Sequence, residues 1–200
     1  MNSMDSRPCV VLSGSSGSGK TILAQRISRA FGYEYIQAPT RSLEQKHGGR
    51  DLINSDRKVR KAFQADVAKT ISENLNTKIK NLFSKKEPYI PFVTDRGIDF
   101  LMYECVYGGE ASETVQKDYV EDLVSSLQMR NVKVYMLTRD DAEMQSPQTW
   151  SKPVKHKYYD YHEVLKQEAS LVTVFELLEI PYIRVQRHQI EDFIFPQLER

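Results

Sequence analysis

The sequence predicts an α/β fold, a three-layer sandwich in which helices cover both faces of a mostly parallel five-stranded sheet. Three observations support this prediction. Short apolar runs alternate with helix-like stretches along the 200 residues, the first apolar run leads into a glycine-rich bend, and no internal repeat or low-complexity tract interrupts the order. Strands that alternate with helices form βαβ units, which need a parallel sheet covered on both faces. We therefore expect residues 1–200 to form a single domain.

The predicted strands are short runs of apolar or aromatic residues. The first run, 9–13, is largely apolar and ends at Gly14, which is typical of a buried parallel strand. In the second run, Tyr35 and Ile36 favour extended structure. The predicted strands cover residues 9–13, 33–37, 89–94, 132–137 and 181–185.

The predicted helices have apolar residues three or four positions apart. From Ser55 to about Lys85 this spacing persists, and Ser55 is a suitable N-cap. Strict four-residue spacing drifts around a straight helix, so two helices or one bent helix also fit this stretch. Near the C-terminus, Val164, Leu171 and Phe175 belong to one apolar face. The predicted helices cover residues 20–31, 55–85, 99–107, 112–129 and 160–179.

Composition and charge exclude several classes of protein. The chain has 28 basic and 27 acidic residues, so its net charge of +1 gives no global reason to coat nucleic acid. No apolar run approaches the roughly 20 residues of a membrane span, and the polar N-terminus does not resemble a secretory signal. Cys9 and Cys105 are expected to be reduced, buried thiols, and the histidines lack zinc-site spacing. We expect a cytoplasmic protein without a structural metal.

The strongest motif is the segment from Gly14 to Thr21, which matches G-x-x-x-x-G-K-[ST] in full. Glycines allow the backbone N–H groups of such a loop to point at phosphate oxygens, and the helix that follows adds its positive end. We expect Lys20 to reach the β- and γ-phosphates and Thr21 to coordinate Mg²⁺. The predicted ATP-binding residues of the loop are Gly14, Ser15, Ser16, Gly17, Ser18, Gly19, Lys20 and Thr21.

A second motif, Asp95-Arg96, stands where the third strand ends and a helix begins. The carboxyl ends of parallel strands face the ligand crevice, so both side chains are expected beside the phosphates. Asp95 is predicted to bind Mg²⁺ or accept a proton, and Arg96 to hold a phosphate. With Lys20 they form the predicted catalytic set. A surface ion pair with a helix cap is the alternative interpretation.

With these residues identified, the chain resembles the P-loop nucleoside and nucleotide kinases. The likeness rests on GSSGSGKT, on Asp95-Arg96 before a helix with a tyrosine near its second turn, and on a lid-like loop over 139–158. It is nearest to the thymidylate-kinase and deoxynucleoside-kinase branch and to small AAA-domain proteins with a nicotinamide-riboside-kinase-like design. The resemblance implies ATP as phosphoryl donor, Mg²⁺, and an acceptor bound between the long helix and the lid.

The resemblance also implies residues on the two substrate sides. Arg139, at the start of the lid-like loop, is expected to contact the ATP phosphates, together with lysines later in that loop. The segment 38–41 resembles the one in which an arginine commonly meets the acceptor, so Arg41 is the predicted contact there. Asp99 is a second predicted substrate-side residue.

A missing GTPase motif and one departure from the kinase pattern guide the choice of activity. The chain lacks the Asn-Lys-x-Asp motif of GTPases, and Gln37 and Ala38 stand where nucleoside kinases place a carboxylate. A phosphate acceptor is ionised at neutral pH and needs no base, whereas a hydroxyl acceptor usually does. We therefore favour ATP- and Mg²⁺-dependent phosphoryl transfer to a nucleoside monophosphate, although Asp95 or Asp99 offers a base.

Two alternatives stay open at this stage. The first is a kinase of a hydroxyl group on a nucleoside, a small metabolite, or a modified base or end in DNA, which the basic segment 41–61 favours. The second is a non-catalytic ATP-binding switch module. The sequence also leaves open the base preference and the oligomeric state, a homodimer included.

Overall fold

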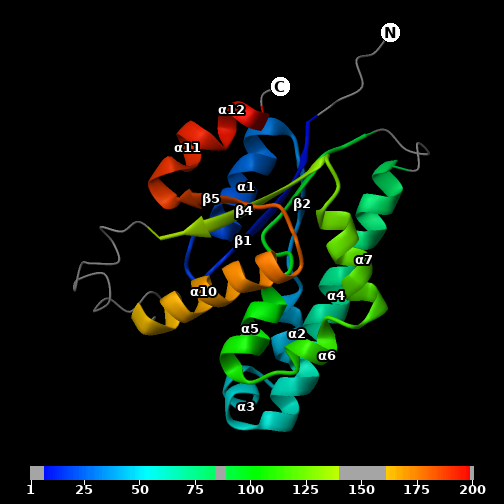
Figure 1. Cartoon of the computed structure of the whole chain (residues 1–200), viewed down its shortest axis with the longest axis vertical. Coiled ribbons are helices and arrows are strands. Elements are labelled where there is room, and N and C mark those ends of the chain that lie inside the picture. The colour runs from blue at the N-terminus through cyan, green and yellow to red at the C-terminus, as the bar shows by residue number, and fades with distance from the viewer. Residues whose placement is uncertain (1–6, 84–88, 140–160, 199–200) are drawn as a thin grey trace.

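Five parallel strands form the centre of the protein in its computed structural model (Figure 1). The structure describes residues 7–83, 89–139 and 161–198. The strand order is β2-β3-β1-β4-β5, and each neighbouring pair is parallel. The fold class predicted from the sequence is therefore confirmed. The strands are β1 (Cys9–Gly14), β2 (Glu34–Ile36), β3 (Phe92–Thr94), β4 (Val132–Thr138) and β5 (Ile183–Gln186).

Long helices lie close to their predicted positions, whereas short helices were not predicted. Residues 112–129 form two helices instead of one, and two short helices follow β2. A helix of four to seven residues has too few turns for its apolar period to be recognised. The helices are α1 (Lys20–Phe31), α2 (Thr40–Lys46), α3 (Arg50–Ser55), α4 (Arg57–Phe83), α5 (Asp99–Tyr107), α6 (Ala111–Thr114), α7 (Asp118–Leu127), α10 (Tyr161–Leu177), α11 (Ile190–Phe193) and α12 (Phe195–Leu198), with the 3-10 helix η1 (Arg187–Gln189).

The central strand β1 shows why both faces of the sheet are covered. Cys9 and Val11 belong to an apolar cluster that includes side chains of α4, α5, α7 and α10. Val10 and Leu12 belong to a second cluster with side chains of α1, α11 and α12. Successive side chains of a strand point to opposite faces, and all four of these are 0% exposed. The two helical layers on either side of the sheet can be followed in Figure 1.

The long helix α4 begins with a different cap from the predicted one. Asp56 Oδ1 accepts hydrogen bonds from the backbone N–H groups of Lys58 (2.7 Å) and Val59 (3.2 Å). Ser55 is instead the last residue of α3, and its hydroxyl donates to carbonyl oxygens of the preceding turn. The predicted Ser55 cap is therefore wrong, because the unpredicted helix α3 ends there. Residues 57–83 then form one helix, not two.

Neither cysteine is part of a disulfide, but the two differ in burial. Cys9 is buried in β1, as predicted, whereas Cys105 on α5 is exposed. The expectation that Cys105 is buried is therefore wrong. None of the helices within the described residues combines the length and apolar character that a membrane span requires.

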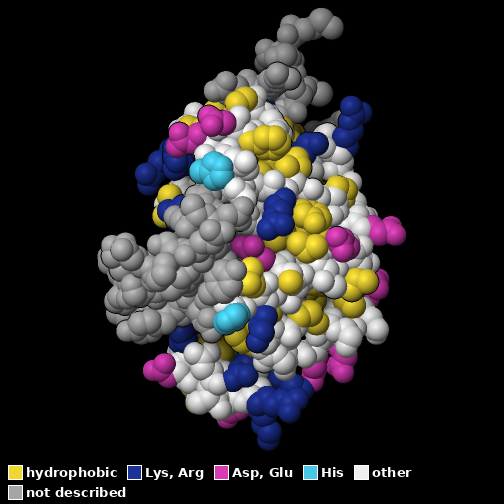
Figure 2. Space-filling view, turned by 60° about the vertical axis from the view of Figure 1, so that its left-hand side comes forward, with side chains coloured by type: hydrophobic (Ala, Val, Ile, Leu, Met, Phe, Trp, Pro, Cys, Tyr) yellow, Lys and Arg dark blue, Asp and Glu magenta, His cyan; other side chains and the backbone are white. Residues whose placement is uncertain are grey.

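Charges of both signs are spread over the surface. Figure 2 shows Lys and Arg side chains gathered at the lower end of the molecule, where Figure 1 places α3, with acidic side chains nearby. Three basic side chains of segment 41–61 form ion pairs: Lys46 with Asp66, Arg50 with Glu44, and Lys61 with Glu110. These pairs reduce the positive charge that the segment presents, so it is a mixed surface more than a basic wall.

The cap of α4 allows a direct stability test. Asp56→Ala removes the acceptor for two backbone N–H groups and is expected to lower the free energy of unfolding by about 1 kcal/mol. Ser55→Ala is the matched control, because the Ser55 hydroxyl contacts only carbonyl oxygens of the last turn of α3 and no N–H group of α4. This substitution should change the free energy of unfolding by no more than a few tenths of a kcal/mol. Urea unfolding of both variants measures the difference. A larger loss in Ser55→Ala would contradict the assignment of the cap.

Candidate active site

Three strands end at one edge of the sheet, and the residues that follow them meet there. The loop 14–21 follows β1, Asp95 follows β3, and Arg139 follows β4. The Thr21 hydroxyl donates to Asp95 Oδ2 at 2.6 Å, and Arg139 Nη2 donates to the Ser16 carbonyl oxygen at 3.3 Å. The fold thus brings together three groups of predicted site residues that are far apart in the sequence.

The backbone of the loop explains why glycines stand at its two ends. Gly14 has φ +148°, and a Cβ atom there would lie 2.3 Å from the Leu137 carbonyl oxygen of β4. Gly19 has φ +92° immediately before α1 begins. Residues with side chains rarely adopt such φ values. The loop can therefore leave β1 beside β4 and enter α1 only with glycine at these positions.

Lys20 is held inside the loop. Its ammonium group donates to the carbonyl oxygens of Gly14 (2.7 Å) and Ser15 (2.8 Å) and to the Ser18 hydroxyl (3.3 Å). The residue is only 7% exposed, and this burial lowers the pKa of its ammonium group below the usual value. An ammonium group has three donors and no acceptor. It can therefore exchange these oxygens only for others, such as those of a phosphate.

Asp99 connects the loop to the turn between β3 and α5. The Gly14 N–H donates to Asp99 Oδ1 at 2.9 Å, and the Gly97 N–H donates to Oδ2 at 3.1 Å. Asp99 is 0% exposed, so both of its oxygens serve the backbone. This geometry supports a role in holding the loop. Its predicted contact with a substrate stays a prediction.

Arg96 is connected to the loop by an aromatic side chain, Tyr103, that lies between them. Its guanidinium carbon is 5.1 Å from the centroid of the Tyr103 ring, a cation–π distance. Tyr103 Oη is in turn 2.8 Å from Ser16 Oγ. Burial alone would raise the pKa of the Tyr103 hydroxyl, but the charges of Arg96 and Lys20 outweigh it and hold this pKa below the usual value. Within the Asp95-Arg96 motif, Asp95 thus contacts Thr21 at the end of the loop, and Arg96 contacts Tyr103, the neighbour of Ser16.

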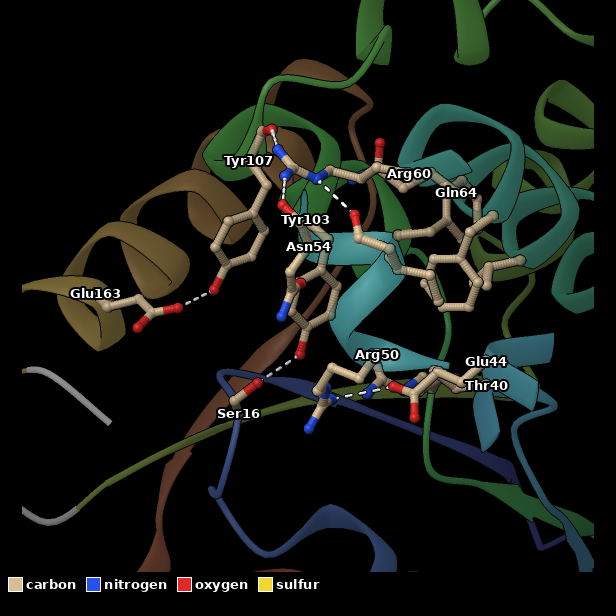
Figure 3. Close-up of a pocket in the computed structure, with 15 residues that line it drawn as sticks. Ser16, Thr40, Glu44, Arg50, Asn54, Arg60, Gln64, Tyr103, Tyr107 and Glu163 are labelled. Carbon is tan, nitrogen blue, oxygen red and sulfur yellow. Dashed lines mark hydrogen bonds and ion pairs between the residues drawn. The ribbon is translucent and has the colours of Figure 1, made fainter. Parts of the chain in front are cut away.

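A cavity of about 610 Å³ opens at Ser16, between α4, α5 and α10 and the short helices α2 and α3 (Figure 3). Aromatic side chains form part of its wall, and the rings of Tyr103 and Tyr107 stack with centroids 6.0 Å apart. We call this cavity the acceptor pocket, after the acceptor site that the sequence predicts between the long helix and the lid. Flat apolar rings of this kind suit a planar ligand such as a nucleobase.

Charged side chains also line the acceptor pocket. Arg50 donates to Glu44 at 3.0 Å, and Glu163 accepts a hydrogen bond from the Tyr107 hydroxyl (Figure 3). Arg60 Nε donates to the Ile53 carbonyl oxygen at 3.1 Å. Arg60 therefore fastens α3 to α4. The arginines of the lining are Arg50, Arg60 and Arg96.

Arg41, the predicted acceptor contact, is exposed on α2 and is not among the described residues that line the pocket. In the sequence, Arg50 and Arg60 stand out only as members of the basic segment 41–61. The sequence held a signal for Arg60, because it precedes Phe63 by three residues and Val67 by seven, a spacing that places all three on one side of a helix. The residues of α4 that line the pocket are Arg60, Phe63, Gln64 and Val67.

Two residues of α10 also contact the loop, and the sequence analysis missed both. The Ser16 N–H donates to Gln167 Oε1 at 2.8 Å, and the Ser15 hydroxyl donates to Glu168 Oε1 at 3.1 Å. Burial raises the pKa of the Glu168 carboxyl. Gln167 stands four residues before Leu171, on the apolar face of the predicted helix. A glutamine on an apolar helix face indicates that a polar partner is packed against that face, because buried amides are hydrogen-bonded.

A second cavity, of about 340 Å³, lies at the other side of the loop, beside Ser18 and Gly19. Arg187 and His188, which follow β5, contribute to its lining. The two cavities thus contact the loop 14–21, which we call the phosphate loop after its sequence motif, at different residues. Apart from Arg139, the predicted lid 139–158 lies outside the described residues.

The residues at the sheet edge fit a magnesium ion better than a transition metal. Thr21 Oγ1 and Asp95 Oδ2 are 2.6 Å apart, and hydroxyl and carboxylate oxygens are the ligands that Mg²⁺ prefers. Within residues 7–83, 89–139 and 161–198, no three His, Cys, Asp or Glu side chains form a group that would hold a metal ion by themselves.

Asp99→Asn tests whether the buried carboxylate holds the loop. The amide offers one acceptor oxygen for two N–H donors, so one backbone N–H loses its partner. We expect the free energy of unfolding to fall by about 1–3 kcal/mol. Asp51→Asn, at an exposed position in the first turn of α3, should change it by only a few tenths of a kcal/mol. Equal effects in urea unfolding would contradict the proposed role.

Glu104, a buried residue of α5, gives a pH-dependent prediction. It is 2% exposed, and burial raises the pKa of its carboxyl above the usual value. A carboxyl with a raised pKa in the folded state contributes stability below its unfolded pKa, about 4.3, and this contribution is lost as pH rises through the folded pKa. Glu104→Gln is therefore expected to be more stable than the wild type near pH 8, with a gain that shrinks toward pH 4.

Urea unfolding between pH 4 and pH 8 measures this difference. Glu73→Gln, at an exposed position of α4, serves as the control and should show little pH dependence relative to the wild type. A gain for Glu104→Gln that stayed constant over the whole range would contradict the prediction.

Comparisons with known proteins place this site in a family. A model of the AAA domain family matches residues 9–192. Among solved structures, the chain is similar to the NadR protein in complex with NR, with a TM-score of 0.59, 15% identity, and coverage of 97% of this chain and 51% of that chain. It spans about half the length of that protein. A comparison with curated protein sequences finds no match.

Two shorter proteins are similar over nearly their whole length. Thymidylate kinase from Candida albicans has a TM-score of 0.55 and 16% identity, with 96% of this chain and 91% of that chain covered. Deoxyadenosine kinase from M. mycoides has a TM-score of 0.53 and 16% identity, with 95% and 94% covered. The chain thus belongs to the AAA-domain family, and it has the fold of the small P-loop nucleoside and nucleotide kinases that its sequence resembles.

Proposed function

We propose that the protein transfers a phosphoryl group from ATP, with Mg²⁺, to a nucleoside monophosphate. One observation carries this proposal. Ser16 belongs to the phosphate loop and also lines the acceptor pocket, so a donor phosphate on the loop and an acceptor in the pocket would meet at this residue. Catalysis of phosphoryl transfer depends mainly on holding the two substrates next to each other and on stabilising the charge of the transferred group.

The donor side of the proposal rests on the loop and the second cavity. Backbone N–H groups of the loop and the Lys20 ammonium would bind the triphosphate. The remainder of ATP would extend toward the cavity at Ser18 and Gly19, where Arg187 and His188 lie. Thr21 and Asp95 would hold Mg²⁺, which neutralises phosphate charge when bound.

The acceptor side rests on the aromatic and arginine side chains of the pocket. Tyr103 and Tyr107 offer a stacked apolar surface for a base. Arg96, next to Ser16 through Tyr103, is the arginine best placed for the phosphates, and Arg50 is a second. With Lys20 and Arg139 they would surround the transferred group with positive charge, which stabilises the charge that develops during transfer.

A hydroxyl acceptor is the second candidate, and one observation favours it. The Glu163 carboxylate lines the acceptor pocket, and a carboxylate is the group that would take the proton of a hydroxyl. The bases considered from the sequence are engaged elsewhere. Asp95 accepts from Thr21 and from the Ala38 N–H. The similar structures include proteins named as kinases of a nucleoside and of a nucleotide, which agrees with either acceptor.

A substrate panel tests the proposal. Purified protein is incubated with ATP and Mg²⁺ and with each common nucleoside or nucleoside monophosphate, and products are separated by chromatography. We expect a nucleoside diphosphate from at least one monophosphate. Lys20→Ala should lower kcat/KM by about 10²-fold or more, whereas Lys69→Ala, at an exposed position on α4, should leave it unchanged.

The outcomes separate the candidates. Product from a nucleoside but from no monophosphate, lost in Glu163→Gln, would replace the proposal with the hydroxyl kinase. Slow ATP hydrolysis that no acceptor stimulates would favour a switch module and overturn both. Thermal unfolding of Lys20→Ala checks that the variant folds, so that a loss of turnover can be assigned to the site and not to unfolding.

A further inference from the structure

Gln167 lies between the phosphate loop and the acceptor pocket and is bonded to both. Its side-chain oxygen accepts the Ser16 N–H at 2.8 Å, and its side-chain nitrogen donates to Tyr107 Oη at 2.9 Å. The residue is 1% exposed. In this surrounding both halves of the amide are satisfied, and the orientation of the amide is determined by its two partners.

The partners of Gln167 belong to a larger network. The Tyr107 hydroxyl donates to Glu163, the carboxylate of the pocket wall (Figure 3). The Tyr107 ring stacks on Tyr103, whose hydroxyl is 2.8 Å from Ser16 Oγ. Ser16 and Tyr107 are thus connected twice, once through Gln167 and once through Tyr103. A change at Ser16 can therefore reach the Tyr107 hydroxyl by two short physical routes.

Phosphate binding changes the situation at Ser16. A backbone N–H donates one good hydrogen bond, and loops of this kind bind phosphate oxygens through such N–H groups. A phosphate oxygen that takes the Ser16 N–H must displace Gln167 Oε1. A buried amide oxygen without a donor is unfavourable, so Gln167 has to rotate, and its bond to Tyr107 breaks with the rotation.

We propose that Gln167 is a positioning residue that couples the two substrate sites. Nucleotide phosphate displaces its oxygen from the Ser16 N–H, and the displaced amide releases Tyr107 to the acceptor. The inference rests on the proposed function, because it requires that a nucleotide binds the loop. Coupling of this kind is reciprocal: an acceptor that engages Tyr107 loosens Gln167 and thereby favours nucleotide binding.

A purely structural role makes a different prediction. Gln167 occupies the apolar face of α10, between Val164 and Leu171, both of which are buried. If it served only for packing, Gln167→Leu would change the stability of the protein and leave its affinity for nucleotide unaltered. The coupling role requires the affinity to change, because the variant removes a competitor for the Ser16 N–H.

Isothermal titration calorimetry with Mg²⁺ and a non-hydrolysable ATP analogue, AMP-PNP, measures this affinity. We expect Gln167→Leu to bind about 5-fold more tightly than the wild type, the change that one net hydrogen bond corresponds to. Gln167→Glu keeps the acceptor and adds a negative charge beside the phosphates, so it should bind more weakly than the wild type. Gln116→Leu, an exposed position between α6 and α7, is the control and should bind like the wild type.

A double-mutant cycle tests the connection to the pocket. Tyr107→Phe removes the partner of the Gln167 amide nitrogen, which makes Gln167 easier to displace and should also tighten binding. Once Gln167 is leucine, Tyr107→Phe should have no further effect on the AMP-PNP affinity. Additive effects would overturn the coupling, since independent sites give additive free energies.

The remaining outcomes are also decisive. Equal affinities for the wild type, Gln167→Leu and Gln167→Glu would overturn the inference and leave the proposed function standing. No binding of AMP-PNP by the wild type would overturn the proposed function and, with it, the inference. If thermal unfolding shows that Gln167→Leu does not fold, Tyr107→Phe decides between the two roles: tighter AMP-PNP binding than the wild type supports the coupling, and unchanged affinity overturns it.

Discussion

The attachment of the phosphate loop to the neighbouring strand is the interaction on which the rest of the site depends. Asp99 accepts one backbone N–H from the start of the loop and one from the turn after β3. Both carboxylate oxygens are buried, so these bonds are made away from water and are costly to break. The turn after β3 carries Asp95 and Arg96. Together with the hydrogen bond from Thr21 to Asp95, the Asp99 side chain therefore holds the motifs of two separate strands in one position.

Ser16 is the second point at which separate parts of the protein meet. Its N–H, carbonyl oxygen and hydroxyl contact Gln167, Arg139 and Tyr103, respectively. These three residues come from α10, from the end of β4 and from α5. The loop is therefore connected to elements on the acceptor side through several bonds of one residue. This junction is the basis of the coupling that we propose between the two substrate sites.

Local patterns were sufficient for most of the fold. A short, nearly continuous apolar run that ends at a glycine is typical of a strand buried on both faces, which is how β1 lies. The loop motif also specified its own conformation, since Gly14 and Gly19 adopt φ values that other residues avoid. The prediction failed for short elements such as α3. It also failed at the start of α4, where the predicted cap, Ser55, is adjacent to the residue that caps the helix, Asp56.

The sequence by itself determined the sheet, the long helices and the phosphate loop, because each depends on residues close together in the chain. It also identified Asp95 and Arg96 as partners of the loop, since parallel strands end at one edge. Only the tertiary structure decided that Arg60 lines the pocket with Arg50 and that Gln167 contacts Ser16. Those contacts join residues far apart in the chain, and the side chain that a helix presents to a distant loop depends on how the helix packs.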